Sequence, residues 1–289
     1  MAPRMGYVHE PFNPQRWPGW SPRIPPHWYL YVCRENEGEH EPWIRDVLSF
    51  RYPILNITSS PDLRHVGQMA VEWPLSIAYR LRGARPLIKD PIALLSSEWL
   101  AERFGMQVLV MIRHPAAFAG SLKRLGWRFD FENWRDQPLL LRDLVGPYGE
   151  AIGRYSAREH DMVDQAILMW NVLHHAIRKF RERHPEWIFV RHEDLSAEPL
   201  KGFRDLFDRL DLLWDRTVED AVIRFSTAQA RKEVPPYLHR TVKRDSRAAR
   251  WTWTSRLTEE EQARIREGTH EVARSFYSDR DWIPTEAST

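Results

Sequence analysis

Continuous apolar runs mark the expected strands of this chain. The run MQVLVMI, residues 106–112, is apolar from Val108 onward, which is typical of a strand in a parallel sheet covered on both faces. Shorter segments predict strands at GYVH (residues 6–9), at RPLIKDP (residues 85–91), where Pro91 ends the strand, and at WIFVRHEDL (residues 187–195).

Helical spacing of apolar residues fills the intervals between these strands. It is clearest over residues 161–183, whose apolar side chains recur every three or four positions as one amphipathic stripe. It also predicts helices at residues 41–50, 62–82, 93–105, 196–212, 217–226 and 258–277, with Gly105 closing the third. Strands that alternate with helices predict a single doubly wound α/β domain over residues 1–289, with ligands at the carboxyl ends of the strands of one parallel sheet.

One stretch has neither pattern. Residues 11–28, PFNPQRWPGWSPRIPPHW, contain six prolines and one glycine, which disfavours helix and strand and predicts an extended loop rich in aromatic residues. Long loops of this kind often cover a binding site, so we expect this one to help form an acceptor pocket.

Composition narrows the classes of function. Apolar residues make up 43% of the 289, and the formal net charge of +2 argues against a protein that coats nucleic acid, so any anion site must be local. A single cysteine cannot form an internal disulfide, which favours a reducing, cytoplasmic location. No apolar run approaches the length of about 18 residues that spans a bilayer, so we expect no transmembrane segment.

An anion site is predicted where the strand at residues 106–112 ends. Arg113 follows the last apolar residue, Pro115 suits the first turn of a helix, and the new helix presents unpaired amides and the positive end of its dipole. The arginine fork matches two phosphate oxygens, and the hydroxyl of Ser121, two helical turns on, could add a further donor. The alternative, a surface ion pair and an ordinary helical serine, is equally open on these residues alone.

This segment resembles the 3′-phosphate-binding motif of sulfotransferases that use 3′-phosphoadenosine 5′-phosphosulfate (PAPS), in which arginine and serine stand eight residues apart. FVRHEDLSAEPLKGFRDLF is similar to the strand, Tyr-Glu-Asp-Leu and helix of that family, with His192 where the tyrosine lies near adenine. The resemblance covers roughly residues 85–260 and implies the P-loop-like sulfotransferase fold.

A basic loop at residues 231–256 would provide a second contact with phosphate. Residues 231–250 hold seven Arg or Lys against two acids. Trp253 resembles the tryptophan before the last helices of the family. Counting back from it, Ser246, Arg247 and Ala248 fall where many members have Arg-Lys-Gly, so Arg247 is the predicted phosphate contact. The alternative is a solvated basic loop, to which Arg231, Lys243 and Arg244 would belong.

The other family signature, a loop resembling Pro-Lys-Ser-Gly-Thr that holds the 5′-phosphosulfate, is not found in this sequence. No GxxxxGK[ST] pattern is found either, which disfavours a nucleotide kinase. The opening residues resemble the family segment that follows this loop, so the first strand and loop would be missing. We expect Met1 to be a misassigned start inside a longer protein, the alternatives being a shortened chain or a degenerate family member, and we expect weak or absent activity.

The resemblance also suggests catalytic residues. In cytosolic members a Lys-Thr-His run supplies a lysine and the histidine base, and here Lys89 is kept while Pro91 replaces the histidine. Glu10 resembles the catalytic glutamate of tyrosylprotein sulfotransferases and is our candidate base. Its alternative is a structural ion pair with Arg16 or Arg23, and Asp90 is the second candidate base, with an ion pair as its expected role.

The sequence therefore predicts sulfonate transfer from PAPS to a hydroxyl or amine of a small-molecule, carbohydrate or lipid acceptor, with no metal and no nucleic-acid partner. Glu10 and Lys89 are the predicted catalytic residues, and Arg113, Ser121, His192 and Arg247 the predicted donor-binding residues. Two alternatives remain, a non-catalytic nucleotide-binding remnant and a nucleotide kinase of related architecture.

Overall fold

The computed structural model describes residues 4–16, 19–59, 63–226 and 250–284. The chain divides into two compact units, Met1–Met106 with Asn133–Asp143 and Gln107–Glu132 with Leu144–Thr289. Each is described by itself, and the single domain expected from the sequence stays a prediction.

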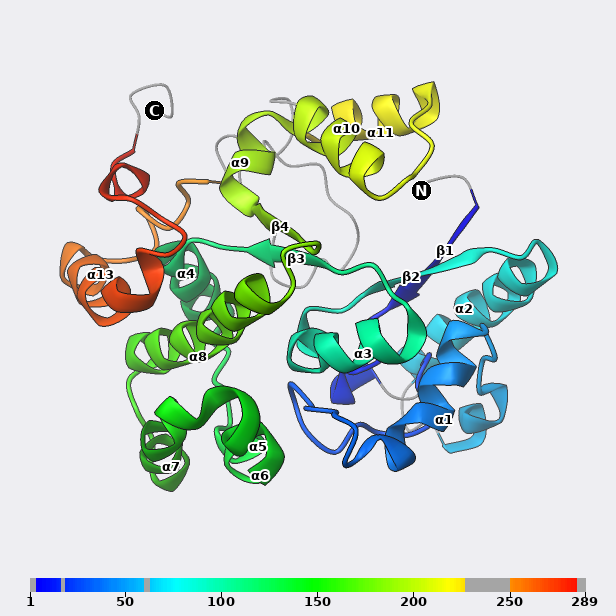
Figure 1. Ribbon diagram of the computed structural model, residues 1–289, viewed down its shortest axis with the longest axis horizontal. Coiled ribbons are helices and arrows are strands. Elements are labelled where there is room, and N and C mark those ends of the chain that lie inside the picture. The colour runs from blue at the N-terminus through cyan, green and yellow to red at the C-terminus, as the bar shows by residue number, and fades with distance from the viewer. Residues whose placement is uncertain (1–3, 17–18, 60–62, 227–249, 285–289) are drawn as a thin grey trace. The chain divides into compact units, whose positions relative to one another are not determined.

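Unit 1 is built around a pair of parallel strands, β1 (Met5–His9) and β2 (Arg85–Lys89), shown in blue and cyan in Figure 1. Helix α2 (Leu63–Leu81) lies between them in sequence and packs on β1. This packing needs Gly6, because a Cβ there would lie 2.3 Å from the Phe50 ring and 3.1 Å from the Tyr79 ring. Gly83, at φ 59°, then turns the chain from α2 into β2.

The remaining elements of unit 1 enclose an aromatic core. Helix α1 (Glu37–Leu48) buries Trp43 against Phe12, and Trp20 packs edge-on against Tyr52. Phe12 and Trp20, two aromatic residues of the proline-rich loop, therefore belong to the core. The other elements are η1 (Pro14–Arg16), η2 (Ile54–Ser59), η3 (Pro91–Ser96), α3 (Ser97–Phe104), α5 (Glu132–Arg135) and α6 (Pro138–Leu140).

Unit 2 contains the parallel strands β3 (Leu109–Ile112) and β4 (Ile188–Arg191) and three packed helices, α4 (Pro115–Leu125), α8 (Met162–Arg183) and α13 (Glu259–Ala273). Asp161 caps α8 by accepting a hydrogen bond from the Val163 amide at 2.9 Å. The smaller elements are η4 (Leu141–Val145), η5 (Gly146–Tyr148), α7 (Gly149–Ala157), α9 (His192–Ala197), α10 (Pro199–Arg209), α11 (Arg216–Ser226) and η6 (Asp279–Trp282).

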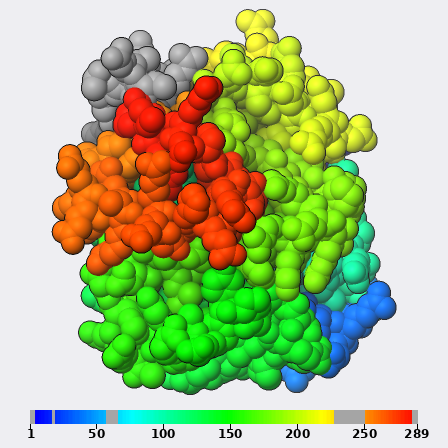
Figure 2. All heavy atoms as spheres, turned by 60° about the vertical axis from the view of Figure 1, so that its left-hand side comes forward, coloured from blue at the N-terminus to red at the C-terminus, as the bar shows by residue number. Residues whose placement is uncertain are grey.

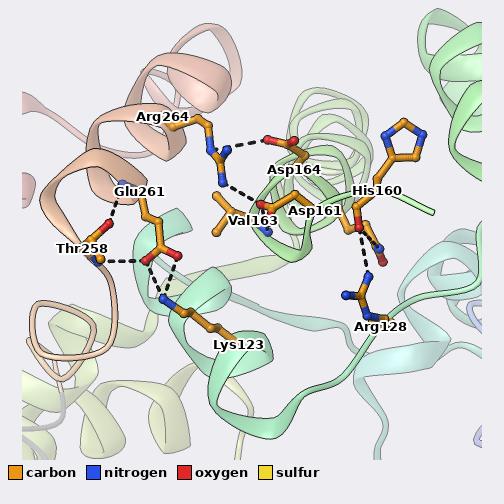
Figure 3. A network of polar contacts seen from close by, with 10 residues as sticks. Lys123, Arg128, His160, Asp161, Val163, Asp164, Thr258, Glu261 and Arg264 are labelled. Atoms are coloured by element: carbon orange, nitrogen blue, oxygen red, sulfur yellow. Dashed lines mark hydrogen bonds and ion pairs between the residues drawn. The ribbon is translucent and has the colours of Figure 1, made fainter.

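Ion pairs hold α13 to its two neighbours in unit 2 (Figure 3). Glu261 completes a capping box with Thr258 and also accepts hydrogen bonds from Lys123 of α4 at 2.7 Å. Arg264 donates to Asp161, the cap of α8, at 2.6 Å. In Figure 2 the orange and red C-terminal residues accordingly lie directly against the green residues of unit 2.

Two expectations about the sheet need revision. The described strands form two separate two-stranded parallel sheets, β1–β2 and β3–β4, so a single doubly wound sheet is not confirmed, although the mixed α/β class with parallel pairing is. The apolar run of β3 predicted cover on both faces, but Met111 is 43% exposed while its neighbours Val110 and Ile112 are buried. Across the described residues, no helix is long and apolar enough to cross a membrane.

Candidate functional site

The carboxyl ends of β1 and β2 bring the two predicted catalytic residues into contact. His9 and Lys89 are the last paired residues of the two strands, and the Glu10 amide donates to the Lys89 carbonyl at 3.1 Å. The ammonium of Lys89 lies 2.5 Å from Oε1 of Glu10, while Asn13 donates to Oε2 at 2.9 Å. We call this group the β1–β2 edge.

The Glu10 carboxylate is enclosed but charged. Its side chain is 15% exposed, against 51% for Lys89. Burial raises the pKa of Glu10, but the hydrogen bonds from Lys89 and Asn13 and the charges of Lys89 and His9 outweigh burial, so the pKa lies below its usual value. Glu10 is therefore an anion at neutral pH, which is the form that can accept a proton.

A histidine that the sequence reasoning missed lies at the same edge. His9 Nδ1 is 3.4 Å from the Tyr7 hydroxyl and 3.8 Å from the Glu10 carboxylate. Burial and the charge of Arg16 lower the pKa of His9, so its imidazole is neutral at pH 7. Its position as the last residue of the predicted strand was the available signal, because the ends of parallel strands meet at one edge.

The ion pair that was considered as the alternative role of Glu10 has a different partner. Glu10 pairs with Lys89 and not with Arg16 or Arg23, since Arg16 faces Glu72 at 3.8 Å and Arg23 donates to a backbone carbonyl.

Asp90, the second candidate base, has a structural role instead of the expected ion pair. Its carboxylate accepts the amides of Phe12 at 2.7 Å and Ile92 at 2.9 Å, which anchors the proline-rich loop and caps η3. Burial raises the pKa of Asp90 to about 6 in spite of these hydrogen bonds.

In unit 2, Arg113 and His192 occupy equivalent places at the ends of β3 and β4. The last register pair of the two strands is Ile112 with Arg191, and Arg113 and His192 are the next residues of each chain segment. The Arg113 carbonyl accepts a hydrogen bond from Trp170 Nε1 at 2.9 Å, which fixes the backbone just before α4 begins. We call this place the β3–α4 corner.

Ser121 lies two turns into α4 and is half-buried, and its hydroxyl makes no hydrogen bond within the described part of the chain. The preceding residue, Gly120, packs against Trp253, where a Cβ would lie 3.4 Å from the Cβ of the tryptophan. The last residues of the predicted basic loop, at Trp253, therefore pack against α4 at Gly120, one position before Ser121. Arg247, Arg231, Lys243 and Arg244 lie outside the described residues.

Glu193 holds the corner together, a role that the sequence reasoning did not assign. Its buried carboxylate accepts the His114 amide at 3.0 Å and the Tyr277 hydroxyl at 2.9 Å, and so joins the start of α4 to the end of β4 and the C-terminal segment. The His114 ring stacks on Trp253 with centroids 5.4 Å apart and meets the Trp282 ring edge-on at 4.4 Å. These hydrogen bonds and ring contacts hold the corner without the help of a ligand.

In the described part of the chain, neither a metal site nor the cavity of unit 1 contributes to the predicted site. No cluster of histidine, cysteine and acidic residues that could hold a metal is found among the described residues. A surface cavity of about 240 Å³ in unit 1 is lined by Arg34, Glu37, Trp99, Glu102 and Arg103, none of which is a predicted site residue.

No protein-family model and no curated protein matches the chain. A solved structure, the sulfotransferase domain from the curacin biosynthetic pathway, aligns with a TM-score of 0.45 and 14% identity over 93% of this chain and 95% of that one. Similarity at this level assigns neither a family nor an activity.

Proposed function

We propose that this protein binds PAPS and transfers its sulfonate group to a hydroxyl or amine acceptor. The observation that carries the proposal is the β3–α4 corner, where a guanidinium stands between the end of a parallel strand and the start of a helix of 11 residues. Such a corner combines the positive end of a helix dipole with the bidentate donor of an arginine, which together suit a phosphate dianion, although the His114 amide already donates to Glu193.

The roles within the corner follow from position. Arg113, just before α4, would contact the 3′-phosphate, and Ser121, within α4, would donate to one of its oxygens. His192, at the end of the neighbouring strand, offers a ring for stacking against adenine. The Glu193 bridge would keep the first turn of α4 in place without contacting the donor.

The β1–β2 edge supplies the groups that the chemistry requires. Glu10 would take the proton of the acceptor hydroxyl or amine. At the same time the oxygen or nitrogen of the acceptor would bond to sulfur, and the bond between sulfur and the phosphate oxygen of the donor would break. Lys89 would donate to the oxygens that gain charge in this step. Adenosine 3′,5′-bisphosphate leaves with the electron pair of the broken bond.

Calorimetric titration with adenosine 3′,5′-bisphosphate tests the binding step. We expect Arg113→Ala to weaken binding at least about tenfold, because it removes a charge-assisted bidentate contact. Adenosine 5′-monophosphate, which has no 3′-phosphate, should bind weakly and be insensitive to this change. Arg204→Ala, which removes an exposed arginine paired with Glu219, is the matched control. Equal affinity of wild type and Arg113→Ala would refute the assignment of the corner.

Transfer from ³⁵S-labelled PAPS to a panel of alcohols, amines, sugars and lipids tests the reaction. Labelled product that disappears in Glu10→Gln would support the proposal. Nucleotide binding without transfer would favour the non-catalytic alternative, and ATP hydrolysis without any response to PAPS would favour the kinase.

A further inference from the structure

Helix α2 presents apolar side chains on two opposite sides. On one side Met69, Ser76 and Tyr79 are buried, and α2 packs with this side on β1. These residues recur at helical spacing together with the half-buried Glu72, so they account for the attachment of α2 to its unit. The other side of the helix takes no part in that packing.

The other side is exposed and almost entirely apolar. Pro74, Ile77 and Leu81 follow one another at intervals of three and four residues and so lie along one line of the helix. The exposed fractions of the large apolar side chains on α2 are 62% for Val71, 42% for Trp73, 42% for Leu75, 39% for Ile77 and 85% for Leu81. We call these five residues the α2 patch. Single exposed apolar residues are ordinary, but a contiguous group marks an interaction surface.

The charged residues that follow Trp73 as far as Lys89 all have one sign. From Trp73 to Lys89 the chain contains Arg80, Arg82, Arg85 and Lys89 and no acidic residue. Arg80 is exposed and stands three residues after Ile77, on the same side of the helix. Arg82 is also exposed, but its guanidinium lies over the ring of the buried Tyr79 at 4.8 Å and donates to the Met5 carbonyl at 3.4 Å. Neither Arg80 nor Arg82 forms an ion pair with an acid within the described ranges of the chain.

From this combination we infer that α2 binds an anionic lipid surface, lying flat with the α2 patch in the headgroup region and the arginines against lipid phosphates. Apolar residues including a tryptophan, flanked by arginines, are the composition of helices that lie in a membrane interface. A protein partner would need acidic groups around an apolar groove, whereas an anionic bilayer offers both features at once. This inference is independent of the sulfonate-transfer proposal.

Co-sedimentation of the full chain with vesicles tests the apolar contribution. We expect binding to vesicles of phosphatidylcholine with phosphatidylglycerol in equal parts, and little binding to phosphatidylcholine alone. Ile77→Gln/Leu81→Gln should reduce the partition coefficient at least about tenfold, because both side chains would lose burial in the interface. Leu125→Gln/Leu213→Gln, which replaces two residues that are 52% and 65% exposed in unit 2, should bind as the wild type does.

A charge series tests the second contribution. Each arginine near an anionic surface contributes about 1 kcal/mol, so Arg80→Gln/Arg82→Gln should weaken binding by about 25-fold. The control Arg34→Gln/Arg204→Gln makes the same change in net charge at other exposed sites and should leave binding nearly unchanged. Raising the salt concentration should weaken binding of the wild type and have less effect on the Arg80/Arg82 variant.

Three outcomes would overturn the inference. Binding that does not depend on phosphatidylglycerol would remove the role of the arginines, and equal binding by both apolar double variants would remove the role of the α2 patch. A dimer in solution that Ile77→Gln/Leu81→Gln dissociates would show that a second copy of the chain covers the patch instead. Circular dichroism of each variant confirms that the exposed substitutions leave the fold intact.

Discussion

Replacement of His114 by phenylalanine should remove a defined part of the acid sensitivity of unit 2. The His114 side chain is enclosed by Trp253, Tyr277 and Trp282, and neither ring nitrogen has a hydrogen-bond partner among the described residues. Its hydrogen bonds are made by the backbone, where the amide donates to Glu193 and the carbonyl accepts from the Phe118 amide. Phenylalanine keeps the ring and this amide but cannot be protonated, so the substitution isolates the titration of one buried group.

The magnitude follows from the difference between the folded and unfolded states. Burial lowers the pKa of His114 to about 4, and the charges of Glu193 and Asp281 offset this only in part. In the unfolded chain the pKa is about 6.5. As pH falls below 6.5 the unfolded state binds the proton first, so the stability contributed by neutral His114 is complete above that pH and is lost toward pH 4. At pH 5 the loss is about 2 kcal/mol.

Urea unfolding followed by far-ultraviolet circular dichroism at pH 7 and pH 5 measures this effect. Other buried histidines also titrate, so the informative quantity is the fall in unfolding free energy from pH 7 to pH 5 in the wild type minus that in His114→Phe, which should be about 2 kcal/mol. Trp282→Phe changes a neighbouring ring that cannot titrate and should lower stability equally at both pH values. Identical pH dependence of wild type and His114→Phe would refute the reasoning.

Three further substitutions probe other parts of the structure. Glu10→Gln should lower the turnover number for sulfonate transfer by about a hundredfold or more while the circular dichroism spectrum is unchanged, because the amide cannot accept the proton. Gly6→Ala should destabilise the fold by about 1–3 kcal/mol in the urea assay, because the added methyl group would lie 2.3 Å from the Phe50 ring. The control Gly38→Ala, which has open space around it, should stabilise the fold by about 0.5–1 kcal/mol. Asp281→Asn breaks a bidentate ion pair with the half-buried Arg191 and should lower the unfolding free energy by about 1–3 kcal/mol. The control Asp279→Asn breaks an exposed ion pair with Arg266 and should lower it by less than about 1 kcal/mol.

The helices with long apolar stripes could be predicted from the sequence. Residues 161–183 became α8, Met162–Arg183, and the helix that Gly105 was expected to close ends there with φ 63°. The stretch between residues 128 and 160 gave no prediction, and it folds into elements of three to nine residues. Elements this short have no periodic stripe, so tertiary contacts decide them.

The same limit applies to the candidate site. Glu10 directly follows one strand and Lys89 ends another, so the alignment of parallel strands was a signal for their contact, although the sequence analysis considered only Arg16 and Arg23 as partners of Glu10. The bridge from Glu193 to the His114 amide joins residues 79 positions apart through one side chain, and no spacing rule predicts such a contact. Separation into two sheets also could not be read from the apolar runs, because a run shows burial and not which strand pairs with it.

The backbone at Glu10 separates a structural from a functional reason for this residue. Glu10 has φ 48°, in the left-handed region where a side chain costs about 1 kcal/mol relative to glycine. If the residue served only the turn after β1, Glu10→Gly would stabilise the protein, and the ion pair with the half-exposed Lys89 would offset little of that gain. We therefore expect Glu10→Gly to unfold at equal or higher urea concentration than the wild type and to lose sulfonate transfer, the pattern of a strained position kept for its carboxylate. A variant that is less stable yet fully active would instead make the Glu10–Lys89 pair a structural contact.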